Sequence, residues 1–393
     1  MKLARRFKHL IGQRKLKVWV LAPHLKTQDE QLDYYYDFSQ SIAEYTCVFE
    51  KLKLQWVWQP VTIEDYQDII HHIQSEALNQ QLLPVILNLC DGDEVNGTPG
   101  ISVVKLLEQL DLVYTGADSY FYEVTTSKVN MKKAFDTHHV VNAPWKEIKE
   151  SNPSPAGIFK RLGTPLIVKP AVSGGSLGVG IKNVVYSPAE MKVEVKKLFS
   201  GYRGWKFGVG GVIAEKFITG PEFTTLIVGS YDQPGHLVYY APVERVFHPS
   251  LPDHEKFLSF ERLWEIYETE SSMPQQGNFY EYKSPDVNFL SAIEHITREA
   301  YISVKGRGYG RVDIRMDQVT GEMYVLEVNA QCGLSEDEDY TSIGAILKVS
   351  NVSFTEVIIE IFKDALRRSI VTKKILHTTK ATVSNKSKKT RIS

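Results

Sequence analysis

The sequence predicts an α/β protein that is α+β in part: an N-terminal parallel α/β domain, a small central α+β lid domain and a C-terminal α+β domain. Strands and helices alternate up to about residue 120, which is typical of a parallel sheet covered by helices. Successive extended segments at residues 164–230 favour antiparallel pairing, and a hairpin follows near residues 310–329. We place the three parts at residues 18–124, 125–230 and 231–371, between a basic extension (1–17) and a basic tail (372–393).

In the first domain, strands and helices are expected to alternate strictly along the chain. Apolar or alternating runs predict strands at residues 18–23, 54–58, 84–89 and 112–114, and helical spacing predicts helices at about 35–52, 63–79 and 98–110. Ligands of such domains bind at the carboxyl ends of the parallel strands.

The other two parts mix antiparallel strands with helices. Strands are expected at residues 166–169, 180–184, 212–218 and 222–228, and helices at about 125–136, 188–199, 288–305 and 353–368. Residues 248–284 are polar and aromatic without a clear period, which makes them a candidate lid or binding loop.

Composition argues against several classes of protein. The 393 residues carry a net charge of −1, so we expect no nucleic-acid partner. Three cysteines are too few and too scattered for a disulfide framework or a zinc ribbon, so a reducing, cytoplasmic location is the simpler expectation. No run approaches the roughly 18 apolar residues of a membrane span.

Both ends of the chain are basic. Residues 1–17 carry seven lysines and arginines and no acid, a pattern that resembles an organelle transit peptide. A strand expected from residue 18 leaves little room for a cleaved leader, so we favour a solvated extension. The tail is rich in Lys, Ser and Thr without acidic residues, and we expect it to be disordered.

The hairpin at residues 310–315 and 324–329 carries the first candidate site. Side chains two apart on a strand share a face, so Arg311 projects with Asp313, and Glu327 projects with Asn329. Pairing of the two strands would bring Asp313 against Glu327 and Asn329. Three oxygen-bearing side chains suit Mg²⁺, which proteins hold with one or two carboxylates plus substrate phosphates. The alternative is a surface hairpin with ordinary salt bridges.

A glycine-rich loop at residues 169–180 is the second candidate site. Its glycines permit close backbone approach, and successive N–H groups can form a nest for anions. The loop lies between two expected strands with Lys169 upstream, so it matches neither a Walker loop nor a Rossmann fingerprint. Lys169 would add a positive charge for a polyphosphate, whereas a flexible hairpin loop is the alternative.

Four runs of the chain match, in order and spacing, the motifs of one enzyme family. They are residues 114–116, 169–179, 215–224 and 311–333. The chain thereby resembles the ATP-grasp ligases, and within them the D-alanine–D-alanine ligase group, over about residues 85–350. The resemblance implies an ATP-grasp fold and a reaction in which ATP converts a carboxylate to an acyl phosphate, releasing ADP, before an amine displaces phosphate to form an amide or peptide bond.

The resemblance also implies how ATP is bound. Phosphate contacts would come from Lys128, Lys169 and Lys283, beneath a loop that includes Gly174, Gly175, Ser176 and Gly178. Adenine would be recognised by the strand edge formed by Glu215, Lys216, Phe217 and Ile218, and the ribose by Glu222.

The implied catalytic groups are Arg311, which would stabilise the tetrahedral oxyanion, together with Lys283 and Ser176. Asp313, Glu327 and Asn329 would hold one or two Mg²⁺ ions, or Mn²⁺ in their place. The implied partners are a small carboxylate and a small amine, and a homodimer is left open.

The chain departs from the family pattern where the substrates are expected. The early glutamate of the family has no clear counterpart, although Asp33 and Asp37 lie near Ser39, and Asp91 replaces the histidine after the third strand. An acidic run at residues 335–339 stands where the family binds the acceptor's carboxylate, and it would repel such a group. We therefore expect an acceptor other than D-alanine; a solvated acidic loop is the alternative. D-alanine–D-alanine ligase activity, L-amino-acid dipeptide ligation and a non-catalytic nucleotide-binding role also remain open.

Overall fold

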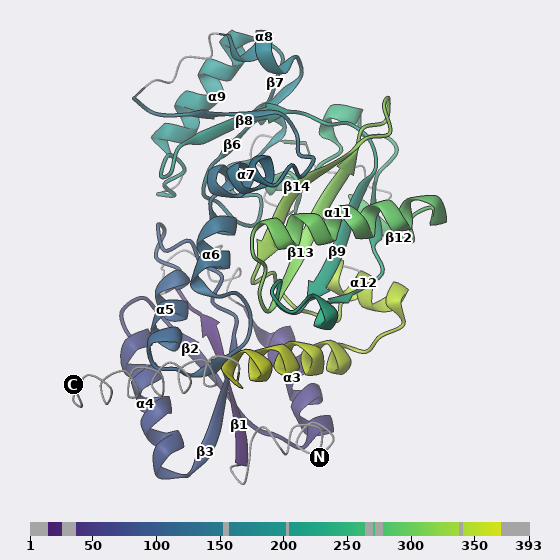
Figure 1. The fold of residues 1–393 in the computed structure, drawn as a ribbon. Coiled ribbons are helices and arrows are strands. Elements are labelled where there is room, and N and C mark those ends of the chain that lie inside the picture. The colour runs from purple at the N-terminus through teal and green to yellow at the C-terminus, as the bar shows by residue number, and fades with distance from the viewer. Residues whose placement is uncertain are drawn as a thin grey trace, which may run out of the picture.

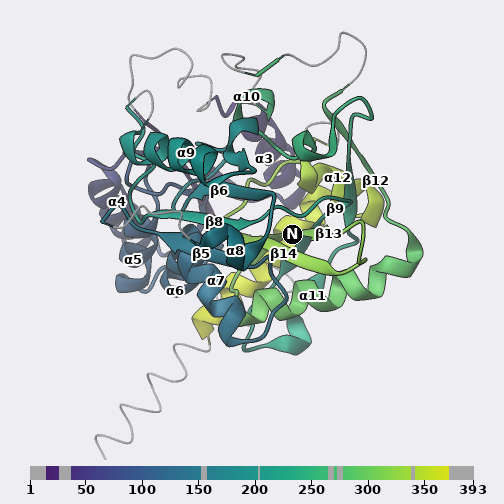
Figure 2. The ribbon, with the colours of Figure 1, turned by 90° about the horizontal axis from the view of Figure 1, so that it is seen from above.

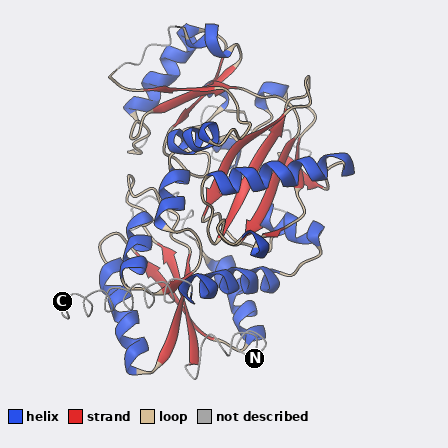
Figure 3. Ribbon diagram, in the orientation of Figure 1, coloured by secondary structure: helices blue, strands red, loops and turns tan. Residues whose placement is uncertain are grey.

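The structure is a computed structural model that describes residues 15–25, 37–151, 157–201, 204–263, 270–271, 278–337 and 341–370. The tail at 372–393 and most of the N-terminal extension lie outside these residues. The described residues form three sheets, which Figure 3 shows in red among blue helices. This mixture of one parallel and two antiparallel sheets confirms the predicted fold class.

The first sheet is parallel and has the strand order β2-β1-β3-β4. Its strands are β1 (Lys15–Pro23), β2 (Gln55–Val61), β3 (Leu82–Asn88) and β4 (Val113–Tyr114), and its helices are α3 (Ser39–Leu52), α4 (Tyr66–Asn79) and α5 (Ile101–Gln109). β1 and β3 are central, and helices cover both faces, which is why these strands are almost continuously apolar.

The single helix expected at 125–136 is wrong, because two helices cover this stretch. They are α6 (Ser119–Thr126) and α7 (Lys128–Thr137). Ser127 between them has an extended backbone, and its hydroxyl accepts the N–H of Asn130 at 3.3 Å. An N-cap of this kind starts a new helix, and here it fixes Lys128 as the first residue of α7.

The second sheet is antiparallel and has the order β5-β8-β6-β7. Its strands are β5 (Trp145–Ile148), β6 (Leu166–Pro170), β7 (Val184–Val185) and β8 (Val212–Lys216), covered by α8 (Ile158–Leu162) and α9 (Pro188–Ser200). The strand expected at 180–184 is mostly a 3₁₀ turn, η1 (Ile181–Asn183). Asn183 causes this, because its side chain accepts the Gly180 N–H at 2.8 Å and donates to the Val168 carbonyl at 2.8 Å.

The third sheet is antiparallel and has the order β12-β11-β9-β13-β14, with β10 beside β9. Its strands are β9 (Glu222–Val228), β10 (Val238–Tyr239), β11 (Val243–Phe247), β12 (Tyr280–Lys283), β13 (Tyr309–Met316) and β14 (Met323–Ala330). The helices after β11 are α10 (Phe260–Leu263), α11 (Leu290–Ser303), α12 (Ser342–Ser350) and a closing helix at residues 354–370, with short 3₁₀ turns at Pro234–His236, Asp253–Glu255 and Val287–Phe289.

β9 lies in this third sheet, although its residues fall within the central part that we expected to end at 230. The chain changes sheet at Gly220, which has φ of 133°. A Cβ there would stand 2.2 Å from the Met316 carbonyl oxygen, so the close approach requires glycine. An alternating pattern predicts a strand but does not determine the sheet to which it pairs.

The third sheet has one apolar and one polar face. α11 covers the apolar face (Figure 1), and its Ile293 belongs to the same apolar cluster as Phe223 and Val312. Seen from above in Figure 2, the strands of the second and third sheets lie next to each other between α9 and α11. No helix among the described residues has both the length and the apolar character that crossing a membrane requires.

Candidate active site

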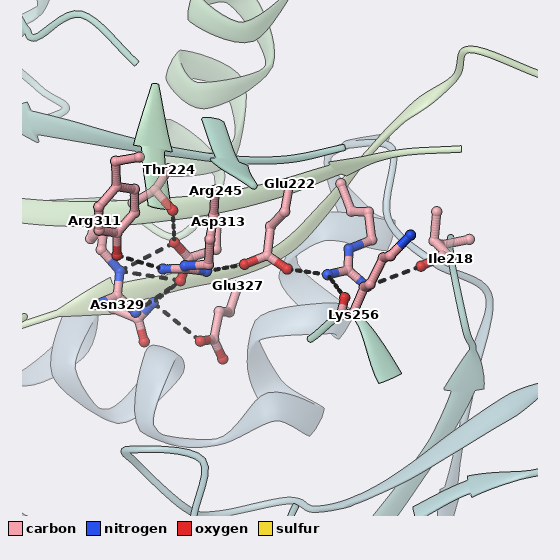
Figure 4. A network of polar contacts seen from close by, with 11 residues as sticks. Ile218, Glu222, Thr224, Arg245, Lys256, Arg311, Asp313, Glu327 and Asn329 are labelled. Carbon is pink, nitrogen blue, oxygen red and sulfur yellow. Dashed lines mark hydrogen bonds and ion pairs between the residues drawn. The ribbon is translucent and has the colours of Figure 1, made fainter. Parts of the chain in front are cut away.

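The polar face of the β13–β14 hairpin brings together the residues predicted from the sequence. Arg311 pairs across the strands with Asn329, and Asp313 pairs with Glu327. The Asn329 amide donates to Asp313 at 3.0 Å and to Glu327 at 3.3 Å. The predicted meeting of Asp313 with Glu327 and Asn329 is confirmed, and Figure 4 shows the cluster.

Asp313 is the most heavily bonded member of this cluster. Its carboxylate accepts from the Thr224 hydroxyl at 2.9 Å, from Asn329, and from Arg311 Nε and Nη2 at 3.2 and 2.8 Å. Burial alone would lower the pKa of the Arg311 guanidinium, but the neighbouring Asp313 charge raises it. The Asp313 side chain is only 8% exposed, so the pair is not an ordinary surface salt bridge. Thr224 was missed, although it lies two residues after Glu222 on the same strand face.

The oxygen atoms of this cluster fit a hard cation in part. Two carboxylates and an amide are the donors that Mg²⁺ takes when substrate phosphates complete its coordination. Among residues 15–370 that the structure describes, no three His, Cys, Asp or Glu side chains converge as a metal-binding group. Glu327 is half-buried and the least bonded carboxylate, whereas Asn329 presents its NH₂ group to both acids, so its amide must turn to offer oxygen.

A group of lysines surrounds Glu215 on β8. Its carboxylate accepts from Lys169 at 2.6 Å and lies 2.7 Å from Lys132, with only 3% of its side chain exposed. Burial works against ionisation of Glu215, but the two lysines outweigh it and hold the pKa at about 2. Lys132 was missed by sequence reasoning. Its position four residues after Lys128 in one helix places both ammonium groups on the same side, which is the available signal.

Lys128 connects α7 to the glycine loop. Its ammonium group donates to the Ser173 carbonyl at 2.9 Å, and its backbone N–H donates to Ala171 at 2.8 Å. Burial lowers the pKa of Lys128, while the Glu327 charge raises it. The Val328 N–H of β14 donates to the Met131 sulfur of α7 at 3.2 Å, so α7 packs against the strand that carries Glu327.

The glycine loop adopts the backbone that its composition predicts. Gly175, Ser176 and Gly178 have φ of 55°, 61° and 74°, a region that favours glycine. A Cβ at Gly178 would lie 2.8 Å from the Pro170 ring, so this position requires the absence of a side chain. Gly174 has open space around it. The loop therefore presents bare backbone beside Lys128 and Lys169, as a phosphate cradle would.

The strand edge predicted to recognise adenine is partly engaged within the protein. The N–H groups of Lys216 and Phe217 donate to the carbonyls of Pro144 and Pro165 at 2.9 and 3.1 Å. The Ile218 carbonyl accepts from Arg315 at 3.2 Å. Recognition of a base along this edge would therefore depend on the backbone groups other than these three.

Glu222, predicted to bind a ribose, lies between two arginines. One carboxylate oxygen accepts from Arg245 and the other from Arg315, and Glu222 is 5% exposed. Sequence reasoning missed both arginines. For Arg315 a signal was available, because it lies two residues after Asp313 and shares its strand face. β11 carries no predicted site residue, so Arg245 had no such signal.

Lys283 lies on the other face of the third sheet. It pairs across the strands with Glu244, which pairs with Phe223, whereas Thr224 pairs with Asp313. Its ammonium group is 3.3 Å from the Glu244 carboxylate. Since neighbours on a strand face opposite ways, we leave Lys283 out of the site proposed below.

The acidic run after β14 contacts the first domain. Glu44 of α3 is 7% exposed and accepts from the Ser335 hydroxyl at 2.7 Å and the Glu336 N–H at 3.3 Å. Burial raises the pKa of the Glu44 carboxyl. Residues 338 and 339 of the run lie outside the described residues.

Known proteins match this chain over most of its length. Residues 135–363 match the family model described as the D-ala D-ala ligase C-terminus. A D-alanine–D-alanine ligase of Nitrosococcus oceani is 28% identical over 273 residues, covering 69% of this chain and 74% of the relative. One from Polynucleobacter asymbioticus is 27% identical, covering 67% of this chain and 69% of the relative.

Solved structures share the fold. The D-alanine–D-alanine ligase of Bacillus anthracis complexed with ATP has a TM-score of 0.64 at 17% identity, covering 91% of this chain and 99% of that chain. The VanG D-Ala:D-Ser ligase of Enterococcus faecalis has a TM-score of 0.62 at 15% identity, covering 90% and 100%. This chain belongs to the D-alanine–D-alanine ligase family of ATP-grasp enzymes, and it is an ATP-dependent carboxylate–amine ligase.

Proposed function

We propose that the enzyme joins an amino acid, or a related carboxylate, to an amine other than D-alanine in the site between the second and third sheets. The carboxylate oxygen attacks the γ-phosphorus of ATP, and ADP leaves. The amine then attacks the acyl carbon, loses a proton and displaces phosphate. The observation that carries the assignment of this site is the partly buried cluster of Arg311, Asp313, Glu327 and Asn329, on a hairpin that packs against α7, the helix that Lys128 begins.

Each group has a distinct role in this proposal. Lys128, Lys169 and the glycine loop bind the phosphates, because fixed cations stabilise charge on the transferring phosphoryl group. Arg311 faces the acyl oxygen as negative charge develops, and Asp313 fixes the orientation of the guanidinium through two nitrogens. Mg²⁺, held by Glu327 with Asp313 and Asn329, would neutralise phosphate charge.

The acyl phosphate must be protected from water. Described residues of the candidate lid segment lie against the far end of the glycine loop. The Phe260 N–H donates to the Val179 carbonyl at 2.8 Å, and Glu270 accepts the Ile181 N–H at 2.7 Å. These bonds support a role for the loop and this segment together in covering the site.

The acidic run supports an acceptor without a free carboxylate. Glu44 and Ser335 hold the start of the run against α3, and Gln40 of the same helix donates to Asp337 at 3.0 Å. The run follows β14, the strand that carries Asn329, after residues 331–334. We therefore place the acceptor's entry near Glu336 and Asp337. Carboxylates there disfavour an anionic tail and favour a cationic or neutral one.

The test is release of phosphate and ADP by the purified protein across amino acids, diamines and amino-acid amides, with D-alanine as the reference acceptor. We expect activity with a cationic or uncharged acceptor to exceed that with D-alanine. Selective activity with D-alanine alone would overturn the acceptor proposal and leave the site intact. Failure of every substrate pair to release ADP would overturn the catalytic assignment itself.

A further inference from the structure

Glu222 is shared by two buried guanidinium groups. Arg245 on β11 bonds one of its carboxylate oxygens, and Arg315 on β13 bonds the other. The three residues are 5%, 4% and 3% exposed for Glu222, Arg245 and Arg315. Two positive charges on one carboxylate leave these three residues with one positive charge in excess, and within the protein only the neighbouring hairpin carboxylates offset it.

The two arginines point to opposite ends of the site. Arg315 also donates to the carbonyls of Ile218 at 3.2 Å and Lys256 at 2.8 Å, at the strand edge expected to bind adenine. Arg245 lies toward Asp313, as Figure 4 shows. Burial alone would lower the pKa of Arg245, but Tyr282, Glu222 and Asp313 raise it.

Aromatic side chains fix Arg245 in place. Its guanidinium carbon lies 5.3 Å from the Tyr280 ring centre and 5.4 Å from that of Tyr282, and Nη2 donates to the Tyr282 hydroxyl at 3.2 Å. Its Nε has no hydrogen-bond partner among the described residues. The guanidinium is therefore a fixed charge that is not fully satisfied within the protein.

Asp313 cannot absorb this charge alone, because Arg311, Thr224 and Asn329 already bond both of its oxygens. Glu327 is the remaining carboxylate of the cluster, and an added anion near Arg245 would offset the guanidinium charge further. Lys128 is the first residue of α7, whose Met131 sulfur accepts the Val328 N–H of β14 at 3.2 Å. A polyphosphate is the anion that the site is proposed to bind.

We propose that Arg245 is a positioning residue for the nucleotide's phosphates: its buried charge attracts the polyphosphate toward Asp313 and, before nucleotide binds, weakens divalent cation binding at the Asp313–Glu327 cluster. This inference rests on the proposed function. Loss of the Arg245 charge should weaken binding of the polyphosphate and strengthen binding of the divalent cation. Loss of a purely structural residue should not change the two affinities in opposite directions.

The first test measures nucleotide affinity by calorimetry without acceptor or metal. Adenosine, AMP, ADP and a non-hydrolysable ATP analogue are titrated into the unmodified protein, Arg245→Gln and the matched control Arg315→Gln. Because the Arg245 charge attracts the phosphates and not the nucleoside, we expect Arg245→Gln to lose about tenfold in affinity for the ATP analogue and little for adenosine. Arg315→Gln should lose similar affinity for all four ligands.

The second test measures binding of Mn²⁺ alone. Arg245→Gln should bind Mn²⁺ several-fold more tightly, and Arg245→Lys should restore both properties toward those of the unmodified protein. If Arg245→Gln does not fold, Tyr282→Phe removes only the hydroxyl that orients Arg245 and should shift both affinities in the same directions by less.

The results of these two tests separate the role of Arg245 from the proposed function on which it rests. Equal losses for adenosine and the ATP analogue, or weaker Mn²⁺ binding, would overturn the role of Arg245 alone. Absence of ATP-analogue binding by the unmodified protein would overturn the proposed function, and this inference with it.

Discussion

Two regions of one sheet face contrast in how their charges are arranged. The β13–β14 hairpin holds Asp313 and Glu327 beside a single guanidinium, that of Arg311, whereas the neighbouring β9 position holds Glu222 beside two. The first arrangement leaves Glu327 available to a cation, and the second leaves positive charge available to an anion. A ligand that carries both metal and phosphate matches the two regions together, which is what the family's use of ATP requires.

Removing a negative charge from the hairpin should have the largest effect on activity. Glu327→Gln keeps the shape of the side chain but removes the carboxylate with the fewest protein donors. We expect kcat to fall by about 10²- to 10³-fold, the loss typical of removing one electrostatic group at a transition state. ADP release measures this effect, and an unchanged thermal unfolding midpoint shows that the fold persists. Full activity in the variant would contradict the assignment of Glu327 to the metal.

The next largest effect concerns Glu215 and the two lysines that contact it, Lys132 and Lys169. The Glu215 pKa of about 2 lies below its ordinary value of 4.5, so Glu215 stabilises the folded state at pH above about 4.5. That contribution, about 3 kcal/mol, should disappear as the pH falls from about 4.5 to 2. Urea unfolding across this range measures the slope, and Glu215→Gln should flatten it. If the free energy of unfolding of Glu215→Gln still falls as steeply with pH, other carboxyl groups cause the pH dependence.

A smaller effect is expected for the preference of the enzyme between ATP and 2′-deoxyATP, which depends on Glu222. Because both carboxylate oxygens bond arginines, Glu222 should discriminate poorly among nucleotide sugars. We expect kcat/KM for ATP and 2′-deoxyATP to agree within about threefold, less than one well-made hydrogen bond contributes. A preference for ATP of a hundredfold would indicate that the arginines release Glu222 when nucleotide binds.

The smallest effect is expected at Lys283, which lies on the far face of the sheet beside Glu244. Lys283→Ala should change kcat/KM for ATP by less than about twofold, since an exposed ion pair contributes little. Lys169→Ala, which removes an ammonium group beside the glycine loop, is the matched comparison and should cost far more. Equal losses in the two variants would restore Lys283 to the phosphate site.

The predictable part of the site is the part fixed by local geometry. Asp313, Glu327 and Asn329 lie on one hairpin, so their spacing alone determines that they meet. Arg245 reaches the site from β11, which carries no predicted site residue, and no local pattern encodes its contact with Glu222. The sequence also predicted β9 as a strand but not its sheet, because the partner depends on the turn at Gly220.

The closing helix has a consequence for how the chain is made. The first sheet is complete at Tyr114, but residues 354–370 supply much of the apolar layer over its α3 side, where Phe362 stacks on Phe49 at 6.2 Å. Arg368 then donates to the carbonyls of Tyr114 and Gly116. The first domain thus obtains part of its covering from a helix that is synthesised after the other two sheets. Until residues 354–370 are synthesised, the apolar face on the α3 side of the first sheet is exposed to solvent. A truncation before residue 354 would leave that face exposed permanently.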